Sequence, residues 1–186
     1  MSMFRKFAAS RLPAELAAEL PLEPGDRVLA WSPLAGGGAV AATVNGLRVL
    51  SPAGRTLSRD WEQVRRAAWD RGSSTLAVTW VTGPRVTPLE VTRPGRLPEV
   101  VHERVRSSVV LSREVDLPGG RTAWVALRRT AGGGLVSQAV PGPGVRLEDP
   151  AVAEALGRAQ EGLRDEAGGA RGPGAEGMPG SPGRWS

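Results

Sequence analysis

Short apolar segments alternate with glycine- and proline-rich turns along most of this chain. Runs of four to eight residues that are bounded by turn residues and follow one another at hairpin spacing are typical of antiparallel strands. The pattern predicts six strands in the first half of the chain, over residues 28–31, 39–44, 47–51, 59–70, 75–81 and 86–91. We expect residues 59–70 to be a single strand that bends at Arg65 and Arg66.

Alternation within these segments predicts which side chains face the core. Leu47 and Val49 share one face of their strand, and Arg48 lies on the other. Leu76, Val78 and Trp80 likewise share one face of their strand, and Trp31 and Trp80 are expected to point inward.

The turns between the strands have their own signatures. Asn45-Gly46 is typical of a two-residue type I′ hairpin, because both central residues of that turn need a positive φ. Glycines 36–38 and 132–134 could instead suggest phosphate cradles. Phosphate-binding loops directly precede a helix, however, whereas these two precede strands, and neither contains a Lys. The sequence therefore favours hairpin turns at both places.

Two segments show helical periodicity. Residues 12–20 carry leucines four residues apart, at Leu12, Leu16 and Leu20, and predict a short helix that lies on the domain. Residues 97–106 carry an apolar stripe, with Pro98 in the first turn; the stripe consists of Leu97, Val100, Val101 and Val105. Six antiparallel strands at this spacing are typical of an up-and-down barrel or a sandwich. A helix that follows them directly is expected to close the open end of a half-closed barrel.

A second, smaller unit follows the barrel. Strands are predicted over 108–115, 122–130 and 135–140, and a helix over 150–167 with Val152, Leu156, Ala159 and Leu163 on its apolar face. The unit looks too small for a core of its own, so we expect it to pack on the barrel. The predicted organisation is an N-terminal arm (1–24), the barrel with its helix (25–107), the extension (108–167) and a disordered tail rich in glycine and proline (168–186).

Composition limits the chemistry that this chain can perform. Among 186 residues there is no Cys, no Tyr, a single His and a single Lys, so disulfides and thiolate metal sites are excluded. His102 has neither a second His nor a Cys near it, and we expect it at an exposed or edge position of the helix. Asp60, Glu62, Asp70 and Glu90 are expected to be solvated at strand ends. We therefore expect neither an enzyme nor a cofactor.

Charge adds little to this picture. The formal net charge is +5, and all but one of the 24 basic residues are Arg, a bias that is typical of GC-rich genomes. Such a surplus is modest for a nucleic-acid-binding protein. The chain contains no run of about 18 apolar residues, and its first residues lack the apolar stretch of a signal peptide. We expect a cytoplasmic protein.

Three stretches of the sequence resemble the bacterial pleckstrin-homology-like domains. Residues 25–31 look like the opening strand of that family, 40–50 like its second hairpin, and 60–64 with Trp69-Asp70 like its fourth strand. The helix at 97–106 is similar to the family's closing helix. The resemblance covers about the first two thirds of the chain, and residues 12–167 also resemble a group of small proteins from GC-rich Gram-positive bacteria, with 95–101 and Asp149-Pro150 as markers.

The resemblance implies a mostly β, α+β fold, namely an antiparallel barrel of about six to seven strands that a helix closes, with a three-strand and helix extension. It also implies a binding role without a known ligand. Phosphoinositide binding needs cations in the first hairpin, and residues 34–39 contain none.

Two binding functions remain open. The first is a non-catalytic module that docks another protein through an edge strand or a Trp-containing patch. The alternative is weak binding of nucleic acid or an anionic membrane surface through a basic patch. The candidate patch for either function consists of Arg55, Arg59, Trp61, Arg65, Arg66, Trp69 and Arg71. Interleaved carboxylates, among them Asp60 and Asp70, would offset part of its charge.

Overall fold

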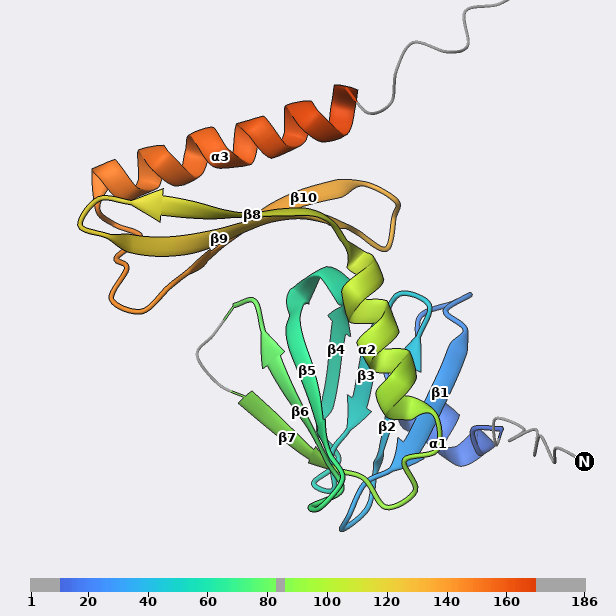
Figure 1. Ribbon diagram of the computed structural model, residues 1–186. Coiled ribbons are helices and arrows are strands. Elements are labelled where there is room, and N and C mark those ends of the chain that lie inside the picture. Colours follow the sequence, from blue (N-terminus) through green and yellow to red (C-terminus); the bar gives the residue numbers. More distant parts are fainter. Residues whose placement is uncertain (1–10, 83–85, 170–186) are drawn as a thin grey trace, which may run out of the picture.

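The computed structural model describes residues 11–82 and 86–169, and strands predominate among them (Figure 1). The predictions for residues 1–10, 83–84 and 170–186 fall outside the described residues. Residues 168 and 169, predicted to begin a disordered tail, instead end the last described helix. In chain order the elements are α1 (Ala14–Glu19), β1 (Val28–Pro33), β2 (Ala39–Thr43), β3 (Gly46–Leu50), β4 (Thr56–Asp60), the 3-10 helix η1 (Trp61–Gln63), β5 (Val64–Asp70), β6 (Thr75–Trp80), β7 (Val86–Glu90), α2 (Leu97–Ser108), β8 (Val109–Leu117), β9 (Arg121–Arg129), β10 (Leu135–Pro141) and α3 (Pro150–Gly169).

The first seven strands form two antiparallel sheets around one core. The sheets have the orders β1-β2-β3-β4 and β5-β6-β7, and an isolated bridge between Leu34 and Val91 joins them at one corner. α2 lies across this pair of sheets (Figure 1) and contacts β5, η1, β1 and β2. Its predicted stripe packs into the core, with Leu97 and Val101 fully buried. The expectation that the helix packs its apolar stripe on the strands is thus confirmed. A closed barrel is not shown, because the strands form two separate sheets.

The β2–β3 hairpin lies where the sequence predicts it, but the predicted turn type is wrong. β2 ends at Thr43 and β3 begins at Gly46, so Val44 and Asn45 form the connection, and neither Asn45 nor Gly46 is among the described residues with positive φ. Polar side chains hold the turn instead. The Thr43 hydroxyl accepts a hydrogen bond from the Gly46 N–H (3.0 Å), and the Asp26 carboxylate accepts one from the Asn45 N–H (3.2 Å).

The predicted single strand over 59–70 is also wrong, because the chain changes sheets within it. β4 ends at Asp60, where the Gln63 side chain accepts a hydrogen bond from the Asp60 N–H (3.0 Å). The turn of η1 carries the Trp61 indole into the core, where it donates to the Thr43 carbonyl (3.1 Å). The register of β5 with β6 then shifts between Val64 and Arg66, so the predicted irregularity is a bulge that follows the corner.

The glycine-rich connection between β1 and β2 is a hairpin turn, as predicted. Glycines 36–38 all have positive φ, a conformation that other residues adopt at a cost. The helix at the N-terminal end also lies on the first sheet. Leu12, Leu16 and Leu20 pack with Trp31 and Leu50 on the sheet face opposite the main core, so the central strands β2 and β3 are buried on both faces.

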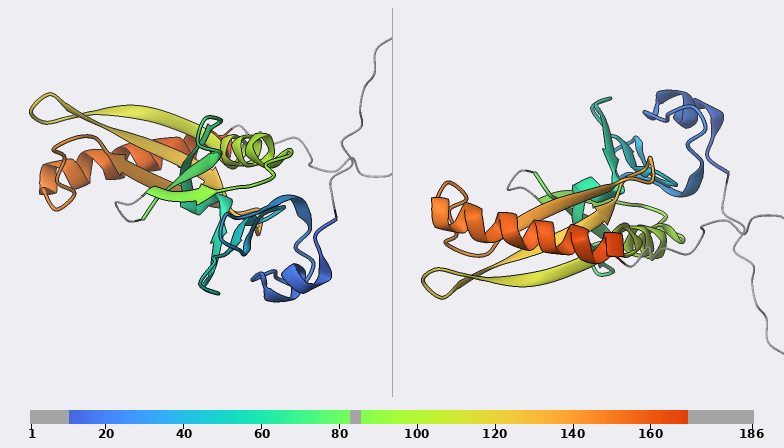
Figure 2. Two further views of the ribbon diagram at one scale, coloured as in Figure 1. Left: turned by 90° about the horizontal axis from the view of Figure 1, so that it is seen from below. Right: turned by 90° about the horizontal axis from the view of Figure 1, so that it is seen from above.

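The extension is a third antiparallel sheet, with the order β10-β9-β8, whose one face α3 covers (Figure 2). Ala123 and Val125 of β9 form a buried cluster with Val152, Leu156 and Leu163 of α3. The expectation that this unit has no core of its own is therefore wrong. The reason is that the 20-residue helix is long enough to bury a whole face of the sheet.

Candidate functional site

The structure distributes the predicted basic patch over both sheets. Arg55 precedes β4 and Arg59 lies in it, Arg65 and Arg66 lie in β5, and Arg71 follows β5; all five are exposed. The two tryptophans do not lie beside them on the surface. Trp61 is only 5% exposed, and Trp69 is partly buried against the same core. Among the described residues, the half-exposed tryptophan is Trp124 on β9, at 50%.

Carboxylates offset the charge of this surface. Residues 11–82 and 86–169 contain 19 Arg and 18 Asp or Glu, so this part of the chain is nearly neutral. Next to Arg71, the Asp70 carboxylate accepts hydrogen bonds from the Ser73 hydroxyl and the Gly72 N–H (both 2.8 Å). These hydrogen bonds lower the pKa of Asp70, with the Ser73 hydroxyl contributing most, so Asp70 opposes the charge of Arg71.

An apolar groove of about 480 Å³ lies between β4 and β7, which are edge strands of their sheets. Leu34, Val49, Leu57 and Leu89 supply its apolar surface, and all four belong to or pack on the main core. The exposed side chains of Arg55 and Glu90 supply opposite charges at its walls. The other lining residues are Ala35, Ser51, Pro52, Thr56, Thr87 and Pro88.

A smaller, more polar cleft of about 200 Å³ lies where the extension meets the first unit. Trp61 and Glu62 of η1, Arg104 of α2 and Arg129 of β9 are among its lining residues. Burial raises the pKa of Glu62, more than a hydrogen bond to its own backbone N–H lowers it. One carboxylate oxygen of Glu62 has no hydrogen-bond partner among the described residues.

Arg128 holds the two units together beside this cleft. Its guanidinium is buried and donates to the carbonyls of Trp61 (3.3 Å) and Val64 (2.8 Å) and to the Ser108 hydroxyl (3.0 Å). From β10, the Gln138 amide donates to the Glu62 carbonyl (2.7 Å). Burial lowers the pKa of Arg128, and the nearby charge of Glu62 partly opposes this. These hydrogen bonds fix the position of η1 relative to the extension. The sequence pattern predicted neither η1 nor these contacts.

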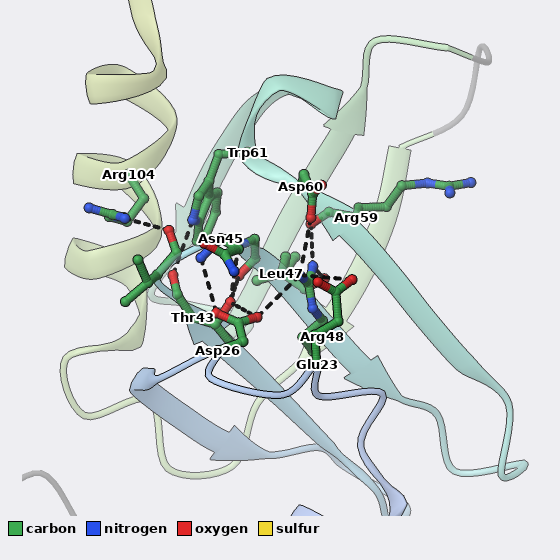
Figure 3. A network of polar contacts seen from close by, with 12 residues as sticks. Glu23, Asp26, Thr43, Asn45, Leu47, Arg48, Arg59, Asp60, Trp61 and Arg104 are labelled. Carbon is green, nitrogen blue, oxygen red and sulfur yellow. Dashed lines mark hydrogen bonds and ion pairs between the residues drawn. The ribbon is translucent and has the colours of Figure 1, made fainter. Parts of the chain in front are cut away.

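Arg48 is the centre of a buried polar network that sequence reasoning missed (Figure 3). Its side chain is completely buried and lies 3.2 Å from an Asp26 carboxylate oxygen and 3.1 Å from one of Asp60. It also donates to the Arg59 carbonyl (3.0 Å). Alternation placed Arg48 on the face opposite Leu47, as observed. It did not show that the N-terminal segment covers that face. The buried network joins Asp26 of the N-terminal segment to Asp60 at the end of β4.

Within residues 11–82 and 86–169, no group of three or more His, Cys, Asp or Glu side chains is arranged to hold a metal ion. No helix in the described part of the chain combines the length and the hydrophobicity that spanning a bilayer requires. Comparison with protein-family models, with curated proteins and with solved structures gives no significant match to this chain.

Proposed function

We propose that this chain is a non-catalytic docking module of the pleckstrin-homology-like kind, which binds a segment of another protein in the groove between β4 and β7. The arrangement of a four-stranded sheet, a three-stranded sheet and the helix α2 supports the resemblance (Figure 1). The groove carries the functional part of the proposal. Concave, mostly apolar sites with a few polar groups at their walls are the usual form of a binding site.

Protein segments suit this groove for two reasons. β4 and β7 are edge strands, and unpaired strand edges recognise extended peptides through their backbones. The walls also offer Arg55 and Glu90, which can orient a partner by charge. The non-catalytic part of the proposal rests on the residue inventory. His102 lies exposed on α2, and Arg55 and Glu90 are the only titratable side chains that line the groove as described.

Selection of peptide ligands against the full chain tests this proposal. Peptides from a displayed random library would be measured on the wild type and on two alanine-to-tryptophan variants. Ala35→Trp fills the groove, since Ala35 lines it. The matched control Ala68→Trp adds the same ring to an exposed position of β5. We expect affinity to fall at least about tenfold, or 1.4 kcal/mol, in Ala35→Trp only. Equal affinity for both variants would disprove groove binding.

The alternative function is the binding of an anionic polymer. The exposure of Arg55, Arg59, Arg65, Arg66 and Arg71 favours it, whereas the near-neutral charge of the described residues does not. It predicts that binding to single-stranded DNA or anionic vesicles falls steeply with salt concentration. The double substitution of Arg65 and Arg66 by Glu should then abolish binding. If neither single-stranded DNA nor anionic vesicles bind the wild-type chain at low salt, this alternative is eliminated.

A further inference from the structure

The two edges that border the groove differ in what they offer to an added strand. Directly before β4, the Arg55 carbonyl accepts from the Ser51 N–H (2.8 Å), and within β4 Leu57 pairs with Val49. Because hydrogen-bonded pairs alternate along an antiparallel ladder, Arg55, Leu57 and Arg59 direct their backbone groups toward β3. Thr56 and Ser58 direct theirs away from it. No hydrogen bond from another described element engages those outward groups.

β7 lacks a donor at the corresponding place. The Val91 N–H donates to the Ser74 carbonyl (2.9 Å), so the same alternation directs the backbone groups of Glu90, Pro88 and Val86 away from β6. Pro88, in the middle of this edge, has no N–H, and the Glu90 carbonyl already accepts from Ala35 (2.8 Å). Proline on an edge strand discourages strand addition. Of the two edges that border the groove, as far as the described residues show, β4 alone presents free donor and acceptor pairs at two successive outward positions, Thr56 and Ser58.

The side chains of β4, together with that of Arg55 directly before it, specify the chemistry of a partner. Arg55, Leu57 and Arg59 are two residues apart and therefore share a face of the strand. Leu57 lines the groove and packs on the main core. Arg55 and Arg59 are exposed and form no ion pair with a described residue. Figure 3 shows the Arg59 side chain directed away from the buried Arg48 network.

We infer that the partner segment adds to β4 as an extra strand and carries the pattern acidic–x–apolar–x–acidic. In this register the apolar residue lies opposite Leu57, and the two acidic residues lie opposite Arg55 and Arg59. Opposite charges directly across two strands stabilise the pair, and like charges destabilise it. The inference rests on the proposed docking function and names the class of partner that the groove accepts: an extended acidic peptide segment of another protein.

A defined probe tests this inference with the full chain. The probe is the end-blocked peptide Thr-Glu-Thr-Val-Thr-Glu-Thr, whose binding is measured by calorimetry or amide shift changes. The two threonines that flank Val would bond to Thr56 and Ser58. N-methylation of both should therefore weaken binding at least about tenfold, since two hydrogen bonds are lost. N-methylation of Val is the matched control, because its N–H points away from β4; affinity should stay within about threefold.

Charge provides the second arm of the test. Replacing both glutamates of the probe by lysine should weaken binding at least about tenfold. The substitution Arg55→Glu together with Arg59→Glu should restore binding of the lysine probe and abolish binding of the glutamate probe.

The outcomes separate this inference from the proposed function. If the probe binds equally well with N-methylated threonines, strand addition is wrong. If it does not bind in the millimolar range, the inferred pattern is wrong. In both cases the docking function would still be supported if library peptides bind the wild type more tightly than Ala35→Trp. If no library peptide loses affinity in Ala35→Trp, both proposals are wrong.

Discussion

The side chain of Arg48 decides how the first sheet is covered. It lies between Asp26 of the N-terminal segment and Asp60 at the end of β4, with no exposed surface of its own (Figure 3). Burial of a charge is unfavourable unless partners replace the lost water. Here two carboxylates and a backbone carbonyl replace it. The network therefore ties the segment before β1 to the far edge of the sheet.

Replacement of Arg48 by methionine should lower the free energy of unfolding by about 3–5 kcal/mol, because Asp26 would remain buried without its partner. The matched control Arg59→Met changes an exposed side chain that is directed away from the network (Figure 3). The backbone carbonyl of Arg59 is retained, so stability should alter by no more than about 0.5 kcal/mol. Urea denaturation measures both. Similar midpoints for the two variants would show that the network contributes nothing.

Glu62 gives stability a pH dependence whose sign follows from its raised pKa. When the folded pKa lies above the unfolded one, the folded state binds the proton more tightly, so stability decreases as pH rises through the interval between the two values. At neutral pH the ionised carboxylate therefore destabilises the fold, and below the unfolded pKa this effect vanishes.

Glu62→Gln should accordingly unfold at higher urea concentration than the wild type at pH 7, and this difference should shrink as the pH falls below the usual glutamate pKa. Glu114→Gln, at an exposed position of β8, is the control. If the wild type were instead more stable than Glu62→Gln at pH 7, and this difference disappeared in acid, the assigned sign would be wrong.

At the scale of elements, the β2–β3 hairpin shows how a correct strand prediction can carry a wrong turn. Gly46 is required because the backbone of the neighbouring strand lies close to it, and not because its φ is positive. A Cβ at this position would collide with the Arg59 carbonyl oxygen of the neighbouring strand and with the Arg48 guanidinium. The hairpin and the buried network thus depend on one small residue.

Gly46→Ala should lower the free energy of unfolding by about 1–3 kcal/mol, since the backbone of β4 would have to move away. A Cβ at Gly132 would meet no atom within 4 Å, and its φ is not positive. Gly132→Ala should therefore change stability by no more than about 0.5 kcal/mol. Thermal and urea unfolding of the two variants compare them directly, and equal stabilities would contradict the collision.

At the scale of the whole molecule, two separate cores meet at a polar junction. The main core and the cluster between α3 and its sheet share no residue, and the buried Arg128 joins the units through backbone carbonyls of η1 and β5. An interface of this kind specifies orientation, because hydrogen bonds require a defined geometry.

Arg128→Met should cost about 2 kcal/mol or more, because buried carbonyl groups would lose their donor, and should speed amide exchange around η1 and β9 first. The neighbouring exposed residue provides the control Arg129→Met, with no such change expected. Hydrogen exchange followed by mass spectrometry distinguishes them. Unchanged protection at η1 in Arg128→Met would show that the junction holds without this side chain.

Local pattern was sufficient for much of the fold. Alternation and turn residues located most strands, and the stripe from Leu97 to Val105 identified α2 as the helix that packs on the core. The apolar pattern failed over residues 59–70, where it predicted one strand although the chain changes sheets at Trp61–Gln63. A corner between two sheets does not interrupt the local apolar pattern. The groove was not predicted, although one candidate residue, Arg55, lines it.

The sequence by itself determined the mostly β composition, the positions of the helices and the scarcity of catalytic side chains, since these follow from residue type and from spacing within a few positions. Only the tertiary structure decided that β4 and β7 border one groove, that Arg48 is buried between Asp26 and Asp60, and that Arg128 reaches η1. Each of these contacts joins residues from separate segments, whose meeting depends on how whole sheets pack and leaves no periodic signal along the chain.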